Sequence, residues 1–475
     1  MKNKSILTVL LSLALVTQSV PTAHANDFRL GPLIDLSDPD VFAACRSNGA
    51  EKECSIAVNP TDPKNLVTAW IGGGFMGIGA AVSIDGGKHW QQVLIPGLSV
   101  CNGGTQDFKG TADPWLSFAP NGELYHLCLA GDRAGRGAVL VSKSFDGGLH
   151  WNNPSLLWDT TDKRMQPDFT RITADRTDAR YVYATWDNCA NGNRGPGILA
   201  RTTDGGRTWE PARIIYDPGT ADNGTLGHVI NVLPSGALVD VFTEFKFSDD
   251  GTHKGALLSV IHSFDKGQSW SAPVRMTAIP IFAVTDPETG TLIGTSTSFC
   301  CPNPAVAMDP RNGNLYVVWE DTQFSNGQNG SIAFSMSSDG GFTWSAAIQV
   351  NRTPLNIPAA NRQAFIPAIA VAADGTIGVT YYDLRFNDSN PGLPTDYWMV
   401  HCHPSVMTPP SKPASWGSEI RLTAQSFDIE KVAPGDRYFI GDYQGLATVG
   451  NDFVPTWSQP HDNDYNSIFF RRVGP

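Results

Sequence analysis

Ser83-Ile84-Asp85-Gly86-Gly87-Lys88-His89-Trp90 is the first of five copies of one eight-residue motif in the sequence. In each copy, the Asp carboxylate can accept backbone N–H bonds across a turn, a glycine supplies positive φ, and the tryptophan buries a large ring beneath the turn. The motif therefore predicts five hairpin turns, whose aspartates lie 61, 58, 61 and 74 residues apart. The other four copies are Ser144–Trp151, Thr202–Trp209, Ser263–Trp270 and Ser337–Trp344.

Two apolar segments joined by a short turn precede each motif, and a sixth such pair follows the last one. Short apolar segments at even spacing are typical of β-strands. Two strands before each motif and two around it make a unit of four antiparallel strands, which predicts a β-propeller blade. The paired segments are Ser55–Val58 with Leu66–Trp70, Trp115–Phe118 with Leu124–Leu127, Thr170–Thr173 with Tyr181–Ala184, Val229–Val232 with Leu238–Val241, Ala305–Met308 with Leu315–Val318, and Ala368–Val371 with Ile377–Thr380.

The composition agrees with an all-β chain. Of the 475 residues, 41% are hydrophobic and 10% aromatic, enough to bury a large core, whereas 47 glycines and 33 prolines disfavour long helices. The five motifs resemble the Asp-box of sialidase-type β-propellers. The resemblance implies a propeller fold, and it implies that the boxes lie on the face opposite the active site.

The two chain ends supply the remaining blades. After Ala368 the Asp-box is lost, but Trp416–Leu422 copies the strand that follows each box, so we expect a sixth, degenerate blade. Three strand candidates in the tail lack a fourth, and the N-terminal segment Phe28–Asp35 resembles the missing outer strand. Because closing the ring removes an open sheet edge, we predict one seven-bladed propeller domain over residues 26–475, with six blades as the alternative. The tail candidates are Gly445–Val449, Phe453–Trp457 and Ser467–Arg471.

The first 25 residues have the pattern of a removable signal peptide. Lys2 and Lys4 precede an apolar run, Ile6–Val16, and Ala23-His24-Ala25 is a small-residue cleavage site. We therefore expect a secreted or periplasmic protein. With 32 basic residues left against 46 acidic ones, the mature chain carries −14, which disfavours nucleic acids and anionic membranes as partners. No later apolar run is long enough to predict a membrane span.

Eight cysteines in an exported chain favour disulfides over metal thiolates, because the compartment is oxidising and no paired C-x-x-C spacing occurs. We expect Cys45 to pair with Cys54 and Cys101 with Cys128, and we leave the other pairings open. The adjacent Cys300 and Cys301 are expected to join two different loops rather than each other. The remaining cysteines are Cys189 and Cys402.

Polar residues gather where the first strand of each blade starts and where the second strand ends. Both positions lie opposite the Asp-boxes, and the ring brings seven such strand ends to one axial mouth, where propellers bind ligands. We therefore look for the functional site there. The acidic and imidazole side chains are Glu53, Asp113, Asp168, Asp187, His228, Glu244, Glu320, Asp321, Asp383 and Asp442, and the arginines are Arg46, Arg164, Arg362, Arg385 and Arg437.

The resemblance to sialidases implies three arginines that bind the sugar carboxylate, a tyrosine nucleophile activated by a glutamate, and an aspartate acid/base. On this basis, we predict an exported carbohydrate-active enzyme, an exo-acting glycoside hydrolase of sialidase type, whose partner is a glycan or glycoconjugate and which is a monomer. The predicted catalytic residues are Asp113, Glu244, Asp383 and Tyr438, with Tyr382 as the other candidate nucleophile; the predicted substrate-binding residues are Arg46, Arg362, Arg385, Arg437 and His228.

The sequence departs from the sialidase pattern at two points. The first arginine of the family lies in a Phe-Arg-Ile-Pro motif, whereas this chain has Ala364-Phe365-Ile366-Pro367, with Arg362 nearby. The expected ring also has seven blades, whereas sialidases have six. A sialidase site would require Arg362 and Arg437 to face the axis and share one carboxylate.

Two alternatives from other functional classes stay open. A polysaccharide lyase or endo-acting glycosidase would use Asp113, His228, Glu244 and Tyr382 in an open groove. A non-catalytic propeller would bind glycans or proteins at the same mouth. No cofactor is expected: Asp462-Asn463-Asp464 could hold calcium, but it lacks the glycine and terminal glutamate of an EF-hand loop, so a turn is favoured there and no metal site is predicted.

Overall fold

The computed structural model describes residues 28–37, 41–42, 50–105, 107–132, 134–163, 165–188, 195–219, 223–247, 253–294, 302–417, 419–461 and 464–475. Several sequence predictions fall outside these ranges. They concern the signal peptide, Arg46, Arg164, four of the cysteines (Cys45, Cys189, Cys300 and Cys301), and the first two residues of the calcium candidate.

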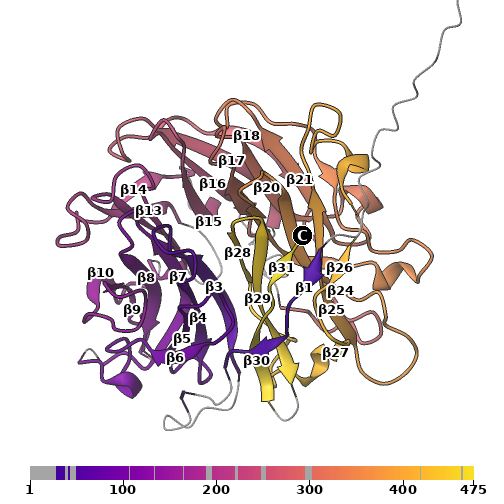
Figure 1. Ribbon diagram of the computed structural model, residues 1–475, viewed down its shortest axis with the longest axis horizontal. Coiled ribbons are helices and arrows are strands. Elements are labelled where there is room, and N and C mark those ends of the chain that lie inside the picture. The colour runs from indigo at the N-terminus through magenta and orange to yellow at the C-terminus, as the bar shows by residue number, and fades with distance from the viewer. Residues whose placement is uncertain are drawn as a thin grey trace, which may run out of the picture.

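The described strands form seven antiparallel sheets arranged as the blades of a ring, as Figure 1 shows. The first three blades follow one another along the chain, and each is a simple meander of four strands. They are β3 (Lys52–Val58), β4 (Leu66–Gly72), β5 (Gly77–Ser83) and β6 (Gln91–Leu94); β7 (Gly110–Phe118), β8 (Leu124–Gly131), β9 (Gly137–Ser144) and β10 (Ser155–Thr160); and β11 (Pro167–Ala174), β12 (Val182–Asn188), β13 (Gly197–Thr202) and β14 (Arg213–Tyr216).

The next three blades repeat this meander, and the sixth has the predicted fourth strand although its Asp-box is missing. They are β15 (Asn223–Val232), β16 (Leu238–Phe247), β17 (His253–Ser263) and β18 (Val274–Ile279); β19 (Ala305–Met308), β20 (Leu315–Asp321), β21 (Ser331–Ser337) and β22 (Ile348–Gln349); and β23 (Ala364–Val371), β24 (Ile377–Asp383), β25 (Pro394–Cys402) and β26 (Ile420–Arg421), with the short β27 (Phe427–Asp428) also paired to β25.

The seventh blade is built from both ends of the chain. β28 (Gly445–Val449), β29 (Asp452–His461) and β30 (Asp464–Phe470) form its inner part, and β2 (Ile34–Asp35) is the outer strand on β30. A second contact pairs β1 (Arg29–Leu30) with β31 (Val473–Gly474), and Figure 1 shows the indigo β1 beside the yellow C-terminal strands. The predicted closure by the N-terminal segment is therefore confirmed.

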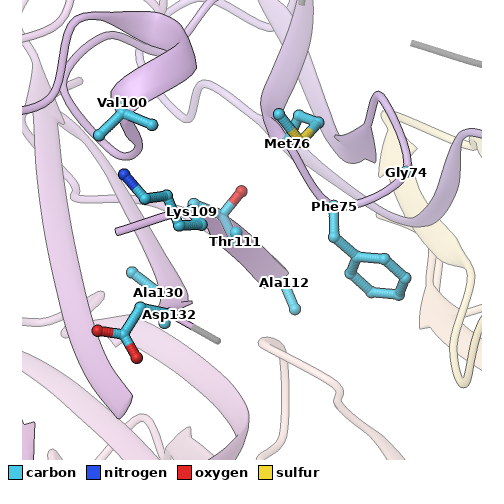
Figure 2. A pocket seen from close by; sticks show the side chains of 11 residues that line it. Gly74, Phe75, Met76, Val100, Lys109, Thr111, Ala112, Ala130 and Asp132 are labelled. Carbon is cyan, nitrogen blue, oxygen red and sulfur yellow. The ribbon is translucent and has the colours of Figure 1, made fainter. Parts of the chain in front are cut away.

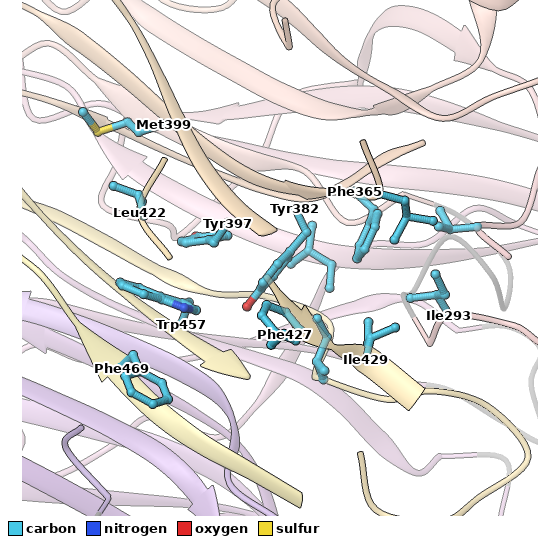
Figure 3. Packing of buried hydrophobic residues seen from close by; sticks show 14 of the residues in the cluster. Ile293, Phe365, Tyr382, Tyr397, Met399, Leu422, Phe427, Ile429, Trp457 and Phe469 are labelled. Carbon is cyan, nitrogen blue, oxygen red and sulfur yellow. The ribbon is translucent and has the colours of Figure 1, made fainter. Parts of the chain in front are cut away.

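The innermost strands of the blades lie side by side around the axis in the order β28, β3, β7, β11, β15, β19 and β23, and β23 returns to β28. The seven-bladed prediction is confirmed, and the six-bladed alternative is wrong. Side chains between neighbouring sheets form the core, and Figure 3 shows this for the sixth and seventh blades. There the rings of Tyr382, Tyr397 and Trp457 follow one another, with centroids 4.5 and 5.3 Å apart.

The Asp-box turns are held by the side-chain bonds that their residue types allow. In the third copy, the Asp204 carboxylate accepts hydrogen bonds from the Thr202 hydroxyl, at 2.8 Å, and from the backbone N–H of Thr208, at 2.9 Å. Because the Thr208 backbone bond stabilises the ionised form, the pKa of Asp204 falls to about 2. The Asp265 and Asp339 carboxylates make equivalent bonds.

Each Asp-box turn also joins its blade to the preceding one. A backbone carbonyl inside the turn accepts a hydrogen bond from a side chain of the neighbouring blade, so the five boxes form a set of inter-blade contacts around one face. The bonds run from Arg472 to Gly86, Asn65 to Gly147, Tyr125 and Lys143 to Gly205, Arg201 to Lys266, and His262 to Gly340.

Asp204→Ala is expected to lower the free energy of unfolding by about 1–2 kcal/mol, because the Thr208 N–H and the Thr202 hydroxyl lose their acceptor. Urea unfolding followed by tryptophan fluorescence measures the change. Any activity per folded molecule should stay at the level of the unsubstituted protein, since the turn lies on the face opposite the site described below. An intact fold with lost activity would contradict this placement.

Both proposed disulfide pairings are wrong. Cys54, Cys128 and Cys402 are free and buried, so Cys54 is not bonded to Cys45, and Cys128 is not bonded to Cys101. Cys101 is disulfide-bonded, to a residue other than Cys128. Burial raises the pKa of the Cys54 thiol to about 11. The free thiols lie on strands whose neighbours already cover them, and they act as small core side chains.

Candidate functional site

The register of the strands places the acidic residues at the end of each blade opposite the Asp-box turns. In the first blade, Val58 pairs with Leu66, and Leu66 pairs with Ser83, the residue that opens the first box. Lys52, at the other end of β3, pairs with Ile71. Lys52 and the adjacent Glu53 are therefore separated from the box by the length of the strand, as the resemblance to Asp-box propellers implied.

Five of the innermost strands start with the same irregularity. Each has a β-bulge at which one residue adopts a positive φ, an uncommon conformation for residues other than glycine. Such strain tends to occur at functional sites. All five bulges lie at the end of the ring opposite the boxes, and they involve Glu53 (φ 54°), Asp113 (53°), Phe169 (48°), Gly227 (71°) and Ile366 (52°).

Four carboxyl groups from consecutive parts of the ring meet at this end: Glu53, Asp113, Asp168 and Asp442. Glu53 and Asp113 interact electrostatically, and they are only 3% and 7% exposed. The charge of Asp168 interacts with those of Asp113 and Asp442. We call these four residues the carboxyl cluster.

The surroundings of the carboxyl cluster favour its protonated forms. Burial, followed by the charges of Asp113 and Asp442, raises the pKa of Glu53 well above its usual range. Burial and neighbouring carboxylates also raise the pKa of Asp168 well above normal, and that of Asp442 to about 7. Burial also raises the pKa of Asp113, while Glu53 and the charge of Arg171 act in the opposite direction.

Two buried cations face the carboxyl cluster. The guanidinium of Arg171 lies over the rings of Trp115 and Tyr443, at 4.0 and 4.3 Å from their centroids, and its charge attracts Asp113 and Asp442. The ammonium of Lys52 lies between the rings of Phe75 and Phe439, at 4.7 and 4.9 Å from their centroids. Burial lowers the pKa of Lys52.

Two cavities adjoin the carboxyl cluster. An axial cavity of about 140 Å³ is lined by residues from all seven blades, including Arg171, Glu320 and Asp442. A larger pocket of about 590 Å³ lies between the first and second blades, and Figure 2 shows its lining. This pocket includes Ala112, the residue before Asp113. The site therefore combines an enclosed acidic centre with an adjacent open pocket of the size that small-molecule sites usually have.

The structure brings two of the predicted site residues into this centre. Asp113 belongs to the carboxyl cluster. The positive charge of Arg437 lowers the pKa of Asp442, so Arg437 lies close enough to act on the cluster, and its Nε also contacts Asp436 at 3.2 Å.

Asp383 and Arg385 lie together in a different network, in the sixth blade. The Arg385 guanidinium pairs with Asp383 at 2.6 Å and with Glu419 at 2.5 Å, and it stacks over the Trp398 ring at 3.7 Å. Asp383 also accepts a hydrogen bond from the Thr353 hydroxyl. Arg385 is only 7% exposed and is held by two carboxylates, so the structure does not bring it to the axial centre.

Glu244 lies in a third network, between the third and fourth blades. Its carboxylate accepts hydrogen bonds from the hydroxyls of Tyr216, at 2.7 Å, and Ser259, and Arg275 lies 3.4 Å away. The Glu244 charge raises the pKa of Arg275. These partners satisfy the carboxylate where it is, and none of them lines the axial cavity.

His228 is fully buried between two carboxylates. Its Nδ1 lies 2.6 Å from Asp240, its Nε2 lies 3.5 Å from Asp187, and its ring stacks on Phe242. The two carboxylates raise its pKa against the effect of burial. The charge of Asp187 in turn acts on Asp168, so His228 adjoins the carboxyl cluster through Asp187 and does not line the axial cavity.

The remaining predicted residues have other surroundings. Arg362 donates two hydrogen bonds to the carbonyl of Ile357, at 3.0 and 2.8 Å. Tyr438 contacts Glu430 at 3.5 Å. Tyr382, the other candidate nucleophile, is buried in the core, where its hydroxyl donates to the Ser458 carbonyl. Phe365 stacks on Tyr382, so the residue in the place of the family's first arginine is a core side chain.

Sequence reasoning missed Arg171 and Lys52. Arg171 lies on an innermost strand at a position where the equivalent strands carry Ser, Trp, Val or Ala, whereas Lys52 lies between two glutamates at the start of its strand. A charged residue inside an otherwise apolar propeller strand was the available signal, because such a residue is buried only with a partner.

Asp442→Asn is expected to raise the free energy of unfolding at pH 7 but not at pH 4. The pKa of Asp442 is about 7 in the folded chain, whereas in the unfolded chain it is near 4. The raised pKa of Asp442 gives a contribution to the free energy of unfolding that is fully present below about pH 4 and is lost as pH rises to about 7. The gain at pH 7 should reach up to about 4 kcal/mol, and urea unfolding at both pH values measures it. An equal change in the free energy of unfolding at the two pH values would contradict the raised pKa of Asp442.

Comparison with known proteins supports the fold. No protein-family model matches the sequence, and no curated protein matches it significantly. Among solved structures, an α-L-arabinofuranosidase of Fusarium graminearum in complex with arabinobiose is 13% identical, covering 94% of this chain and 98% of its own, with a TM-score of 0.50. A Hadza microbial sialidase is 17% identical over 86% of this chain and 73% of its own, with a TM-score of 0.47. The intramolecular trans-sialidase from Ruminococcus gnavus is 14% identical over 94% and 98%, with a TM-score of 0.45.

At 13% identity, the similarity to the arabinofuranosidase shows a β-propeller fold and does not extend to activity. The resemblance that the Asp-boxes indicated is thus confirmed at the level of the fold. Within the described ranges, no helix is long and apolar enough to cross a membrane, and no group of three or more His, Cys, Asp or Glu side chains is arranged to hold a metal ion.

Proposed function

We propose that this chain is a glycoside hydrolase in which Glu53 is the general acid and Asp113 the general base. One observation carries the proposal: Glu53 and Asp113 are both buried and interact electrostatically inside a group of four carboxyls, at the end of the propeller opposite the Asp-boxes. Paired acids whose surroundings favour different protonation states are the arrangement that acid/base catalysis requires.

The chemistry follows from the two protonation states. Glycoside hydrolysis needs one carboxylic acid to protonate the leaving oxygen and one carboxylate to activate water or attack the sugar. Burial beside other carboxyls raises the pKa of Glu53 well above its usual range, which favours the acid form, whereas Glu53 and Arg171 partly offset the rise that burial causes in the pKa of Asp113. Asp442 supports this assignment, since its charge raises the pKa of Glu53.

A neutral sugar is the substrate class that the surroundings favour. Hydrolysis of sialosides, expected from the Asp-box resemblance, needs several arginines free to bind a carboxylate, but Arg362 and Arg385 already bind Ile357 and two carboxylates. The mature chain's charge of −14 also opposes an anionic substrate. The Fusarium graminearum propeller, which acts on arabinofuranosides and binds arabinobiose, is consistent with this class.

A glycan-binding propeller without catalysis is the second candidate. The low exposure of Glu53 and Asp113 favours it, because buried acids can stabilise a site without reaching a substrate. The lyase alternative is supported less well, since Glu244 and Tyr382 lie in separate surroundings and Tyr382 belongs to the core.

Incubation with a panel of glycans tests the proposal. Purified protein is incubated with arabino-oligosaccharides, neutral hexose oligosaccharides, sialyllactose and uronic-acid polymers, and products are identified by mass spectrometry. We expect products from a neutral glycan. Products from sialyllactose would instead support the sialidase prediction, unsaturated products would support a lyase, and silence across the panel would contradict the enzyme.

A further inference from the structure

The pocket between the first and second blades is built from four segments that meet at the end opposite the Asp-boxes. They are the turn after β4, the 3-10 helix Val100–Asn102, the start of β7 and the end of β8, and they contribute Phe75, Val100, Thr111 and Asp132 to the lining. The volume is about 590 Å³, within the range of about 300–1,000 Å³ typical of small-ligand sites. Figure 2 shows these side chains around the pocket.

Phe75 presents an aromatic ring at the edge of this pocket, although its backbone is strained. Its φ is +74°, a conformation that a bulky residue rarely adopts, and its side chain is 40% exposed. Its carbonyl accepts the N–H of Thr111 at 2.8 Å, and Lys52 lies over its ring, so the strained turn is fixed from two sides. Strain of this kind persists where the surroundings enforce it, and it concentrates at ligand sites.

Thr111 supplies an independent observation. This residue lines the pocket and is only 2% exposed, and its hydroxyl has no hydrogen-bond partner. A buried hydroxyl without a partner costs free energy, so a ligand that supplies the missing bond is favoured. Lys109 and Asp132 add a donor and an acceptor on the same wall. A mostly apolar pocket with a few converging polar groups is the usual form of a small-ligand site.

The pocket adjoins the carboxyl cluster at two places. Ala112 lines the pocket and immediately precedes Asp113. Lys52, which stacks on Phe75, is the neighbour of Glu53, and its charge interacts with both Glu53 and Asp442. A glycan cleaved at Glu53 and Asp113 would therefore extend into this pocket with its next sugar.

We propose that this pocket binds one or two sugar residues of a neutral glycan, next to the sugar cleaved at the carboxyl cluster. The inference rests on the proposed function for its account of the neighbouring site. The apolar face of a sugar ring stacks on Phe75, and a sugar hydroxyl bonds to Thr111, while Lys109 and Asp132 bond to further hydroxyls. Specificity for a hydroxylated, uncharged ligand follows from this lining.

Binding of neutral tetrasaccharides to the whole chain tests the pocket without depending on turnover. The probes are arabinotetraose, xylotetraose, cellotetraose, maltotetraose and chitotetraose, and calorimetry measures the dissociation constant of each. The variants are Phe75→Ala, which removes the ring, and Thr111→Val, which removes the hydroxyl at nearly constant shape. Phe145→Ala is the matched control, since Phe145 is also an exposed phenylalanine (69%) but lies in an Asp-box on the opposite face.

We expect at least one probe to bind, with an affinity reduced at least tenfold in Phe75→Ala, about three- to tenfold in Thr111→Val and unchanged in Phe145→Ala. Thermal melting of each variant establishes that it is folded. Failure of all five probes to bind, or equal binding by Phe75→Ala, would overturn the inference. Binding with the expected losses of affinity but no hydrolysis would refute the proposed function and support the pocket as a sugar site. Hydrolysis with an unchanged KM in Phe75→Ala would support the proposed function and refute the pocket as a sugar site.

Discussion

Glu53→Gln is expected to lower kcat on a neutral glycan by about 10²–10⁴-fold, the contribution that a positioned general acid makes. Gln cannot deliver a proton to the leaving oxygen, but its amide can still donate to Asp113, so the fold should be retained. Burial and the charges of Asp113 and Asp442 raise the pKa of Glu53, so substitution by the neutral amide also removes a source of repulsion. The melting temperature should therefore stay the same or rise. Steady-state kinetics and calorimetry on the same sample measure both.

Glu244→Gln is the matched control for this experiment. Glu244 is also a buried glutamate (3% exposed) near the end of a blade strand, but its partners are Tyr216, Ser259 and Arg275. We expect its substitution to change stability, because those hydrogen bonds are altered, and to leave kcat per folded molecule within a few-fold. The opposite result, with activity lost in Glu244→Gln and kept in Glu53→Gln, would place the catalytic centre at Glu244, between the third and fourth blades.

The blade count was predictable because the evidence for it is local and repeated. Each Asp-box fixes a turn by residue type alone, and the apolar segments before it fix two strands. Even the degenerate sixth blade could be recognised, since Trp416–Leu422 keeps the strand that follows a box. Closure by Phe28–Asp35 was predictable for a different reason: the tail held three strands of a four-stranded unit, and an unpaired edge is unfavourable.

Which acids converge was not predictable, because that depends on the bulges. Glu53 and Asp113 occupy the same step of their strands, each at a positive φ, and Asp168 precedes the equivalent residue Phe169. Asp383 and Asp187 both lie near the end of the second strand of their blades. Asp383 is nevertheless bound by Arg385, two residues later, in the outer part of its blade. The cysteine pairing was not predictable either. We expected Cys101 to pair with Cys128, whereas Cys128 is a free core residue.

Arginine placement was the other limit. A list of arginines at the mouth resembles a binding triad, but each guanidinium binds whatever acceptor its own loop supplies. Arg362 is next to a backbone carbonyl from five residues earlier, and Arg385 is next to Glu419, which is distant in sequence. Arg171, a cation at the centre that the sequence did not reveal, is on a strand interior, and its guanidinium lies over two aromatic rings.

Deletion of residues 28–35 from the mature protein is expected to destabilise it by several kcal/mol and to cause aggregation. The deletion removes the pairing of Ile34 with Phe470 and of Arg29 with Gly474, and it leaves the edge of β30 open. It also removes Phe28, whose ring packs 6.1 Å from that of Phe453 in the core between the sixth and seventh blades. Exposed apolar surface and a free strand edge both favour association of chains.

Calorimetry and size-exclusion chromatography of the shortened protein measure these effects, and Leu30→Ala is the control, because Leu30 lies in the same segment but is 42% exposed. The control should change stability by less than about 0.5 kcal/mol, as exposed sites usually do. Equal melting temperatures with and without the segment would mean that the ring closes through the C-terminal strands alone. A large loss of stability should also lower activity. The strand that carries Glu53, β3, packs against β28 and β29 of this blade, so its position depends on the closure.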